Sequence, residues 1–240
     1  MSTRETQDKI IRAAVEQFNA AGASRVSTNR IAEKAGVSRG NLHYHFSDKK
    51  HLILAIWLKI EQEINGWSDE IESPSVSHIA EMTLRQFRLI WQYRFFYQEL
   101  NILLEADSEL KHRFNRLRAN RMESILLFLR SLQETGSIKP SIKDSDLRML
   151  VKISWVLTDF WLPFISVEQE TIEVSTMQDG YELILQLFTP TLTEKALMEI
   201  PASLRVFSIA DGASTLSSGD PLTGRPQAAK SSHQLFHQPS

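Results

Sequence analysis

The sequence predicts an all-α protein. Apolar residues recur at intervals of three and four through most of the chain, which is the periodicity of an amphipathic helix. No segment sustains the alternation of apolar and polar residues that a half-buried strand requires. With 240 residues, of which 42% are hydrophobic and 23% charged, the chain has an ordinary globular composition and is long enough for one or two domains.

The expected helices have recognisable starts and ends. The first covers about residues 4–21, carries an apolar stripe that includes Ile10 and Phe18, and ends at Gly22. Two short helices follow within residues 27–45. The later helices are expected at residues 48–63, 78–92, 96–106, 108–135, 144–166 and 174–188, the last of them ending before Pro190.

The composition changes beyond about residue 200. Ser, Gly, Pro and Gln become frequent and large apolar residues become rare, which predicts a disordered tail at residues 200–240. His233 and His237 lie there at helical spacing, but such a tail lacks the rigid frame that a metal site needs, so we expect no metal. The expected division is therefore residues 1–55, residues 56–195 and this tail.

Charge is distributed unevenly along the chain. Residues 1–60 carry ten Lys and Arg against five Asp and Glu, a net +5, whereas the remaining residues carry a net −7 within the total of −2. Only the first segment has the sign of a surface that approaches phosphates, with clustering by chance as the alternative. Cysteine is absent, which excludes disulfides and thiolate metal sites and favours a cytoplasmic location.

Neither an export signal nor a membrane span is expected. The N-terminal MSTRETQDKI has no apolar stretch behind a basic start. The most apolar window, residues 149–167, approaches the length of a membrane span but contains Lys152, Asp159 and Pro163, each of which is costly in hydrocarbon. We therefore expect a buried helix and no membrane partner.

Residues 26–46 have the pattern of two short helices joined by a tight turn. Ser27 is placed to cap the first helix and Gly36 to end it, and Ser38 is placed to cap the second. Two short helices joined by about three residues that include Gly are typical of a helix-turn-helix.

Small residues are expected where the two helices cross. Ala32 and Ala35 on the first helix and Gly40 on the second would leave room for a close approach. Leu42 and Phe46, four residues apart, are expected to face the core.

The opposite face of the second helix carries side chains suited to a DNA groove. Arg39 can pair with guanine N7 and O6, Asn41 with adenine or a phosphate, and His43 with a base edge or a thymine methyl. Tyr44 and His45 can donate hydrogen bonds to phosphate oxygens. The two histidines, two apart on a helix, point in different directions and would not share a metal ion.

The segment IAEKAGVSRGNLHYHFSDKKHL resembles the DNA-binding motif of the TetR family of bacterial regulators. In that motif an Ile-Ala…Ala-Gly-Val-Ser segment leads to Gly-x-Leu-Tyr-x-His-Phe and a Lys-rich helix start. The resemblance implies a recognition helix at residues 39–46 and a phosphate-binding Lys49. His43 departs from it at a common Tyr position, which bears on operator choice, and Arg30 departs from it at an acidic capping position. The residues expected to contact DNA are Ser27, Thr28, Ser38, Arg39, Gly40, Asn41, His43, Tyr44, His45 and Lys49.

The chain beyond residue 55 carries no catalytic signature. It contains no Gly-rich phosphate loop, no nucleophile elbow and no paired His ligands on one helix face, so we expect neither an enzyme nor a cofactor. Its helices are rich in aromatic residues, most of which we expect to pack in the core while a minority line a cavity. The pocket candidates, chosen by position, are Trp91, Arg94, Met122, Trp155 and Asp159.

Asp159 has two interpretations, because it is an acid among Trp155, Phe160 and Trp161. It is either a counter-charge for a cationic or hydrogen-bonding ligand, or a residue that is hydrogen-bonded across a dimer or simply exposed.

The helix expected at residues 144–166 is apolar almost all round, and one subunit would struggle to cover it. A partner surface is the natural cover. The family resemblance implies the same arrangement, with a helical domain that encloses a small molecule and dimerises through residues 144–166 and 174–188.

These observations together predict a homodimeric repressor. Its two recognition helices would enter successive major grooves of a roughly palindromic operator, about 34 Å apart or somewhat more. A small-molecule effector in the helical domain would favour a conformation that no longer fits, with residues 48–63 as the coupling helix. Two alternatives remain open: an adaptor of the same fold that is controlled by a protein partner, and a ligand sensor that activates transcription.

Overall fold

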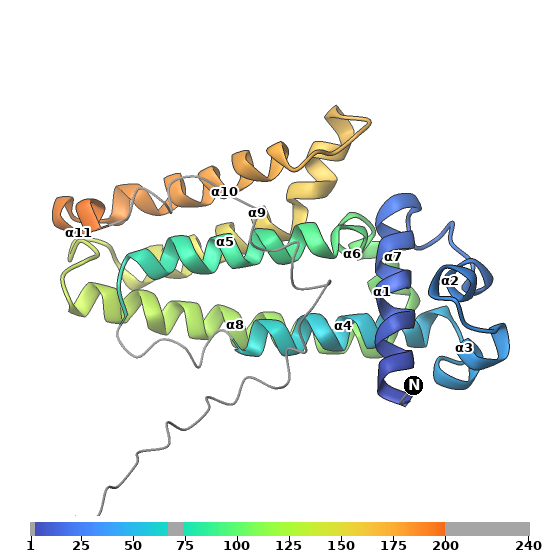
Figure 1. The fold of residues 1–240 in the computed structure, drawn as a ribbon. Helices are drawn as coiled ribbons and strands as arrows, with labels where there is room; N and C mark the ends of the chain where they lie inside the picture. Colours follow the sequence, from blue (N-terminus) through green and yellow to red (C-terminus); the bar gives the residue numbers. More distant parts are fainter. Residues whose placement is uncertain (1–2, 67–73, 200–240) are drawn as a thin grey trace, which may run out of the picture. The chain divides into compact units, whose positions relative to one another are not determined.

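A computed structural model describes residues 3–66 and 74–199 of the chain (Figure 1). These residues are helical with short connections, and their only extended pairing is an isolated antiparallel bridge between Ile138 and Leu192. The all-α prediction is confirmed. The elements are α1 (Thr3–Ala21), α2 (Thr28–Ala35), α3 (Arg39–His45), α4 (Lys49–Gly66), α5 (Ser77–Gln92), α6 (Arg94–Gln98), α7 (Leu100–Ala106), α8 (Ser108–Glu134), α9 (Asp144–Glu168), α10 (Ser175–Phe188), the 3-10 helix η2 (Thr189–Thr191) and α11 (Glu194–Glu199).

Most predicted helices agree with the structure to within three residues at each end, with one exception. The sequence predicts a single helix at residues 96–106, whereas the structure has α6 and α7. The chain leaves helical geometry at Glu99, with φ −104° and ψ 16°. The Glu99 carboxylate there accepts a hydrogen bond from the backbone N–H of Ser24, so a contact distant in sequence accompanies the break. The expected tail and its His233 and His237 lie outside the described residues.

Helices α1, α2 and α3 form the N-terminal head. α1 packs against α2 and α4, and α2 packs against α3. Figure 1 shows α1 running across the ends of α4 and α6, and α1 contacts both helices. The head encloses an apolar core that includes Ile10, Phe18, Ile31 and Leu42, all fully buried.

Helices α5, α8, α9 and α10 form most of the helical domain. α10 packs against α5 and α9, and α9 also packs against α8 and α6. The approach at Gly180 of α10 is tight, because a Cβ atom there would lie 2.5 Å from Phe87 and 2.7 Å from Trp161. The Trp161 indole N–H donates a hydrogen bond to the Thr176 carbonyl at 3.0 Å.

Helix α4 contacts both the head and the helical domain. On the head side, Lys59 forms an ion pair with Asp8 of α1, with a 2.7 Å separation. On the other side, the buried ring of Trp57 stacks on Phe96 of α6 with centroids 5.1 Å apart, and α4 also packs against α8. A shift of α4 would therefore change contacts in both the head and the helical domain.

Helix α9 is buried along only one face, so the expectation of a buried helix is wrong for a single chain. Its inner face includes Leu147 and Leu162, whereas Met149, Val156 and Phe164 are exposed. Its packing partners α5, α6, α8 and α10 leave that second face without a cover. By length and hydropathy alone α9 is also the one helix in the described ranges that is long and apolar enough to cross a membrane, a test that helices of soluble proteins also pass.

Candidate nucleic-acid interface and internal cavity

The helix-turn-helix is held by the three capping residues that the sequence predicts. Ser27 Oγ accepts a hydrogen bond from the Arg30 N–H at 3.3 Å. Gly36 adopts the left-handed conformation, with φ 60° and ψ 41°, and ends α2. Ser38 Oγ accepts from the Asn41 N–H at 3.1 Å and starts α3. These local bonds fix the direction in which α3 leaves the turn.

The inner faces of α2 and α3 pack as predicted, but Gly40 does not. Ala32, Ala35, Leu42 and Phe46 are buried. Gly40 is exposed, and a Cβ atom there would meet nothing within 4 Å. The expectation that Gly40 makes room for the helix crossing is therefore wrong. Gly40 lies on the outer face instead, where its small size leaves the backbone open to approach.

The outer face of α3 presents its side chains to solvent. Arg39, Asn41 and His43 are exposed, and the Tyr44 side chain is 80% exposed. The half-buried His45 ring packs edge-on against Tyr44 with centroids 5.2 Å apart. Thr28 is half-buried, whereas Ser27 and Ser38 are exposed near the same helix starts. The structure thus brings most of the predicted DNA contacts to one surface.

His43 is oriented by the backbone that follows α3. Its Nδ1 lies 3.2 Å from the Ser47 carbonyl oxygen, which can only accept, so Nδ1 carries the proton of this bond. In the neutral ring Nε2 is then an acceptor. This orientation suits a contact with an exocyclic amino group of a base rather than with a carbonyl.

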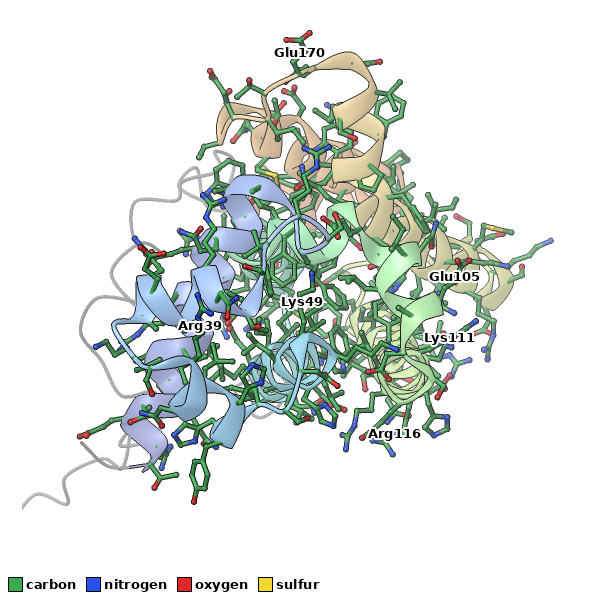
Figure 2. The ribbon with its side chains drawn as sticks, turned by 90° about the vertical axis from the view of Figure 1, so that its right-hand side faces the viewer. Arg39, Lys49, Glu105, Lys111, Arg116 and Glu170 are labelled. Carbon is green, nitrogen blue, oxygen red and sulfur yellow. The ribbon has the colours of Figure 1, made fainter. Side chains whose placement is uncertain are left out.

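Lys49 does not present its ammonium group to solvent in this structure. Its Nζ donates to the carbonyls of Ala23 at 2.6 Å, Val26 at 3.1 Å and Ser24 at 3.3 Å. Lys49 thereby ties the start of α4 to the connection between α1 and α2. Arg39 and Lys49 are labelled in Figure 2. The phosphate contact expected of Lys49 stays a prediction, and it would require the ammonium group to give up at least one of its carbonyl hydrogen bonds for the phosphate.

The start of α4 carries a second polar cluster. Asp48 Oδ1 accepts from the His51 backbone N–H and lies 2.9 Å from His51 Nδ1. These hydrogen bonds, the backbone one first, lower the pKa of Asp48 below its usual value. Lys50 lies exposed in the same turn and is better placed than Lys49 for a phosphate.

The helical domain contains a cavity of about 80 Å³, lined by residues of α5, α8, α9 and α10 together with Ile64 at the end of α4. Of the five pocket candidates, only Trp155 lines it. Arg94 instead lies over the Trp91 ring, 4.7 Å from its centroid, and Met122 packs against the core. The structure therefore does not bring the predicted set together.

Asp159 is 3% exposed, so the interpretation of a simply exposed acid is wrong. Its Oδ2 accepts a hydrogen bond from the Trp155 indole N–H at 2.8 Å, within the same helix. Burial raises the pKa of Asp159 to about 7, against the opposing effects of the Trp155 hydrogen bond and the positive charge of Arg118. The carboxyl lies beside the cavity wall rather than among its lining residues.

Two family models match the chain. Residues 10–56 match the model of bacterial regulatory proteins of the tetR family, and residues 59–200 match the TetR model described as bacterial transcriptional repressor.

The chain belongs to the TetR family.

Curated transcriptional regulators match part of the chain. The regulator AcrR of Shigella flexneri is 39% identical over 61 residues, which is 25% of this chain and 28% of that protein. The repressor BepR of Brucella suis is 26% identical over 132 residues, or 52% of this chain and 63% of that protein. The matched segments thus span from about a quarter to less than two thirds of these relatives.

Solved structures match over most of the chain. A regulator from Marinobacter aquaeolei is 26% identical with a TM-score of 0.73, covering 85% of this chain and 98% of that one. The SmeT–triclosan complex is 18% identical with a TM-score of 0.59, covering 83% and 97%, and at that identity it supports the fold alone.

Arg121 of α8 is the one charged residue among those lining the cavity of this TetR-family chain, and sequence reasoning missed it. It lines the cavity and is 8% exposed. A signal was available, because Arg121 continues at four-residue spacing the inward stripe of Phe114 and Leu117. A cation in that register is unusual, but the sequence around it gives no indication of the cavity, whose walls come from other helices.

Proposed function

We propose that this chain is a homodimeric, sequence-specific DNA-binding repressor that acts in the cytoplasm and leaves its operator when a small molecule enters the helical domain. The observation that carries the proposal is the outer face of α3. Ser38 fixes the start of that helix, and Arg39, Asn41 and Tyr44 project from it into solvent. Side chains in this arrangement fit the edges and phosphates of a major groove.

Dimerisation is supported by the uncovered face of α9. Apolar side chains at spacings of three and four remain exposed along it, and Leu183 of α10 is exposed as well. A second copy of the same face would bury both stripes about a two-fold axis. We infer that residues 144–166 and 174–188 supply this contact, so that the two heads address the halves of a palindromic operator.

The division of labour that we propose is DNA reading by residues 1–55 and effector binding and dimerisation by residues 56–195. The cavity in the helical domain supports a small-molecule effector over an adaptor that responds to a protein partner, since a filled domain would have favoured the adaptor. A structural neighbour is solved as the SmeT–triclosan complex, which adds support by analogy. Whether DNA binding represses or activates is decided by the position of the operator relative to the promoter.

The test is selection of bound sequences from random duplex DNA by the purified full chain, followed by footprinting. We expect a palindromic site whose affinity falls steeply with salt. Arg39→Ala should relax base preference at one position in each half-site, at a cost of about 1–3 kcal/mol. Lys195→Ala, an exposed cation on α11, is the control and should bind like the wild type. A chain that prefers no duplex over random sequence would contradict the proposal.

A further inference from the structure

The polar atoms of the cavity wall are unequally available to a ligand. Three hydroxyl groups line it, and each donates a hydrogen bond to a backbone carbonyl of its own helix. Thr83 donates to Ile79 at 2.7 Å, and Ser154 donates to Val151 at 2.9 Å. Thr158 divides its donation between two carbonyls of α9, at 3.0 and 3.1 Å. These hydroxyls therefore keep lone pairs but no proton for a ligand.

The remaining neutral donors, the Trp155 indole and the Gln86 amide, are also engaged, although the Gln86 amide keeps one N–H. The Trp155 indole N–H donates to Asp159 at 2.8 Å. Gln86 hydrogen-bonds the Tyr97 side chain. Most other lining residues are apolar, among them Ile125, Phe128 and Phe188. A ligand that needs several donors from the wall would find them in one place only.

That place is Arg121. It is the one charged side chain among the residues that line the cavity, and no Asp or Glu lies among them. Its guanidinium is nearly buried, and burial lowers its pKa, although an arginine in a protein still keeps its charge. A guanidinium carries several N–H donors in a planar fork, so it can hold a ligand carboxylate in addition to the interaction that it already makes within the chain.

Resting on the proposed function, we infer that the effector is a small apolar organic acid whose carboxylate binds Arg121 while its hydrocarbon body packs against Ile125, Phe128 and Phe188. The cavity of about 80 Å³ suits a short alkyl chain, and it admits a single ring only if its wall moves. Engineered cavities of about 150 Å³ hold benzene, so such a ring requires the wall to yield somewhat. Met82, whose flexible thioether chain lines the cavity, is suited to that adjustment.

The alternative is a cationic effector, and the placement of Asp159 argues against it. Asp159 is the nearby acid, yet it lies outside the lining and its Oδ2 is bonded to Trp155. Arg118 also acts on its charge. An ammonium group in the cavity would meet Arg121 without an acid in the wall to offset it.

The first test uses matched probes on the wild-type full chain. Calorimetric titrations compare hexanoate with hexanamide and hexylammonium, and benzoate with benzamide and benzylammonium. We expect each carboxylate to bind about tenfold or more tightly than its amide, because a charge-assisted hydrogen bond replaces a neutral one, and the ammonium to bind weakest. An amide or ammonium that binds as well as its carboxylate overturns the inference, as does a lack of binding by both carboxylates up to millimolar concentrations.

The second test locates the charge. Arg121→Gln should bring the affinity for benzoate to within about twofold of that for benzamide, while leaving benzamide binding as it is in the wild type. Arg121→Lys should keep part of the preference. Arg116→Gln, an exposed residue on the same helix, is the matched control and should keep all of it. Circular dichroism checks that each variant folds; if Arg121→Gln does not, the wild-type probe series and Arg121→Lys decide.

The outcomes separate this inference from the proposed function. If benzoate binds through Arg121 but never changes affinity for the selected operator, the ligand class stands and ligand release fails. If the operator is bound and released only by the amides or ammonium compounds, the proposed function stands and the ligand class is wrong. If neither DNA nor carboxylate binds, both fail.

Discussion

The head and the helical domain place their polar groups in opposite environments. In the head, Arg39, Asn41 and Tyr44 lie in water on α3 above an apolar core. In the helical domain, Arg121 and Asp159 are nearly buried among apolar helices. A polar group in water costs the fold little, whereas a buried charge is costly unless it is hydrogen-bonded or paired. Changes to DNA reading can therefore leave stability intact, while changes to the effector region alter stability and function together.

The largest effect expected to sharpen this contrast is the contribution of Asp159 to the pH dependence of folding stability. Its pKa is raised from 3.8 to about 7 in the folded chain. The stability that it contributes is therefore fully present below about pH 3.8 and is lost as the pH rises through about 7. Asp159→Asn keeps an acceptor for Trp155 without the charge. We expect the variant to gain stability relative to the wild type with rising pH, by roughly 4 kcal/mol in total.

Urea unfolding at a series of pH values from 4 to 9 measures this difference between the two proteins. Other titrating groups cancel in the comparison, because both chains share them. Asp146→Asn, an exposed acid on the same helix, is the control. A constant stability difference between Asp159→Asn and the wild type across that range would mean that the carboxyl is not desolvated.

The same contrast explains which features could be predicted from the sequence. The caps at Ser27, Gly36 and Ser38 depend on residues within a few positions of one another, so their spacing alone was sufficient. The inward face of α3 followed from the spacing of Leu42 and Phe46, whereas the role of Gly40 depended on how two helices cross and was predicted wrongly.

The cavity depends on contacts that are distant in sequence. Its wall combines α4, α5, α8, α9 and α10, so periodicity along one helix cannot show which side chains meet. Trp155 was one of five candidates chosen by position and the only one of them that lines the cavity, and Arg121 was missed because its neighbours in space are far away in the chain. The break at Glu99 has the same origin, since it accompanies a contact with Ser24.

A smaller change in stability is expected from substitutions at the start of α4. It tests how sharply the solvent-exposed polar groups of the head are separated from buried ones. The Lys49 ammonium, at the start of α4, donates to three carbonyls of the connection between α1 and α2, so Lys49→Ala should cost about 1–3 kcal/mol of stability by leaving them without that partner. Lys50→Ala removes an exposed cation and should change stability by less than about 0.5 kcal/mol. Thermal unfolding of both variants makes the comparison.

DNA binding by the same two variants separates support from contact. If Lys50 rather than Lys49 reaches a phosphate, Lys50→Ala reduces the salt dependence of operator binding by about one unit of slope. If Lys49 exchanges its carbonyls for a phosphate on binding, its variant shows that reduction as well. A stable Lys49→Ala protein with the reduced slope would contradict the structural role that the three hydrogen bonds indicate.

The smallest expected effect concerns Ser38, because this residue both caps α3 and is expected to contact DNA. Ser38→Ala removes the acceptor of the Asn41 N–H and should cost about 1 kcal/mol of stability. Ser38→Asn keeps a capping acceptor and should restore most of that loss. If Ser38 only starts α3, operator affinity recovers in Ser38→Asn together with stability. If the Ser38 hydroxyl also contacts a phosphate, Ser38→Asn recovers stability but not operator affinity. Measuring the free energy of unfolding and the operator affinity of both variants therefore shows whether an exposed residue of the head couples folding to DNA binding.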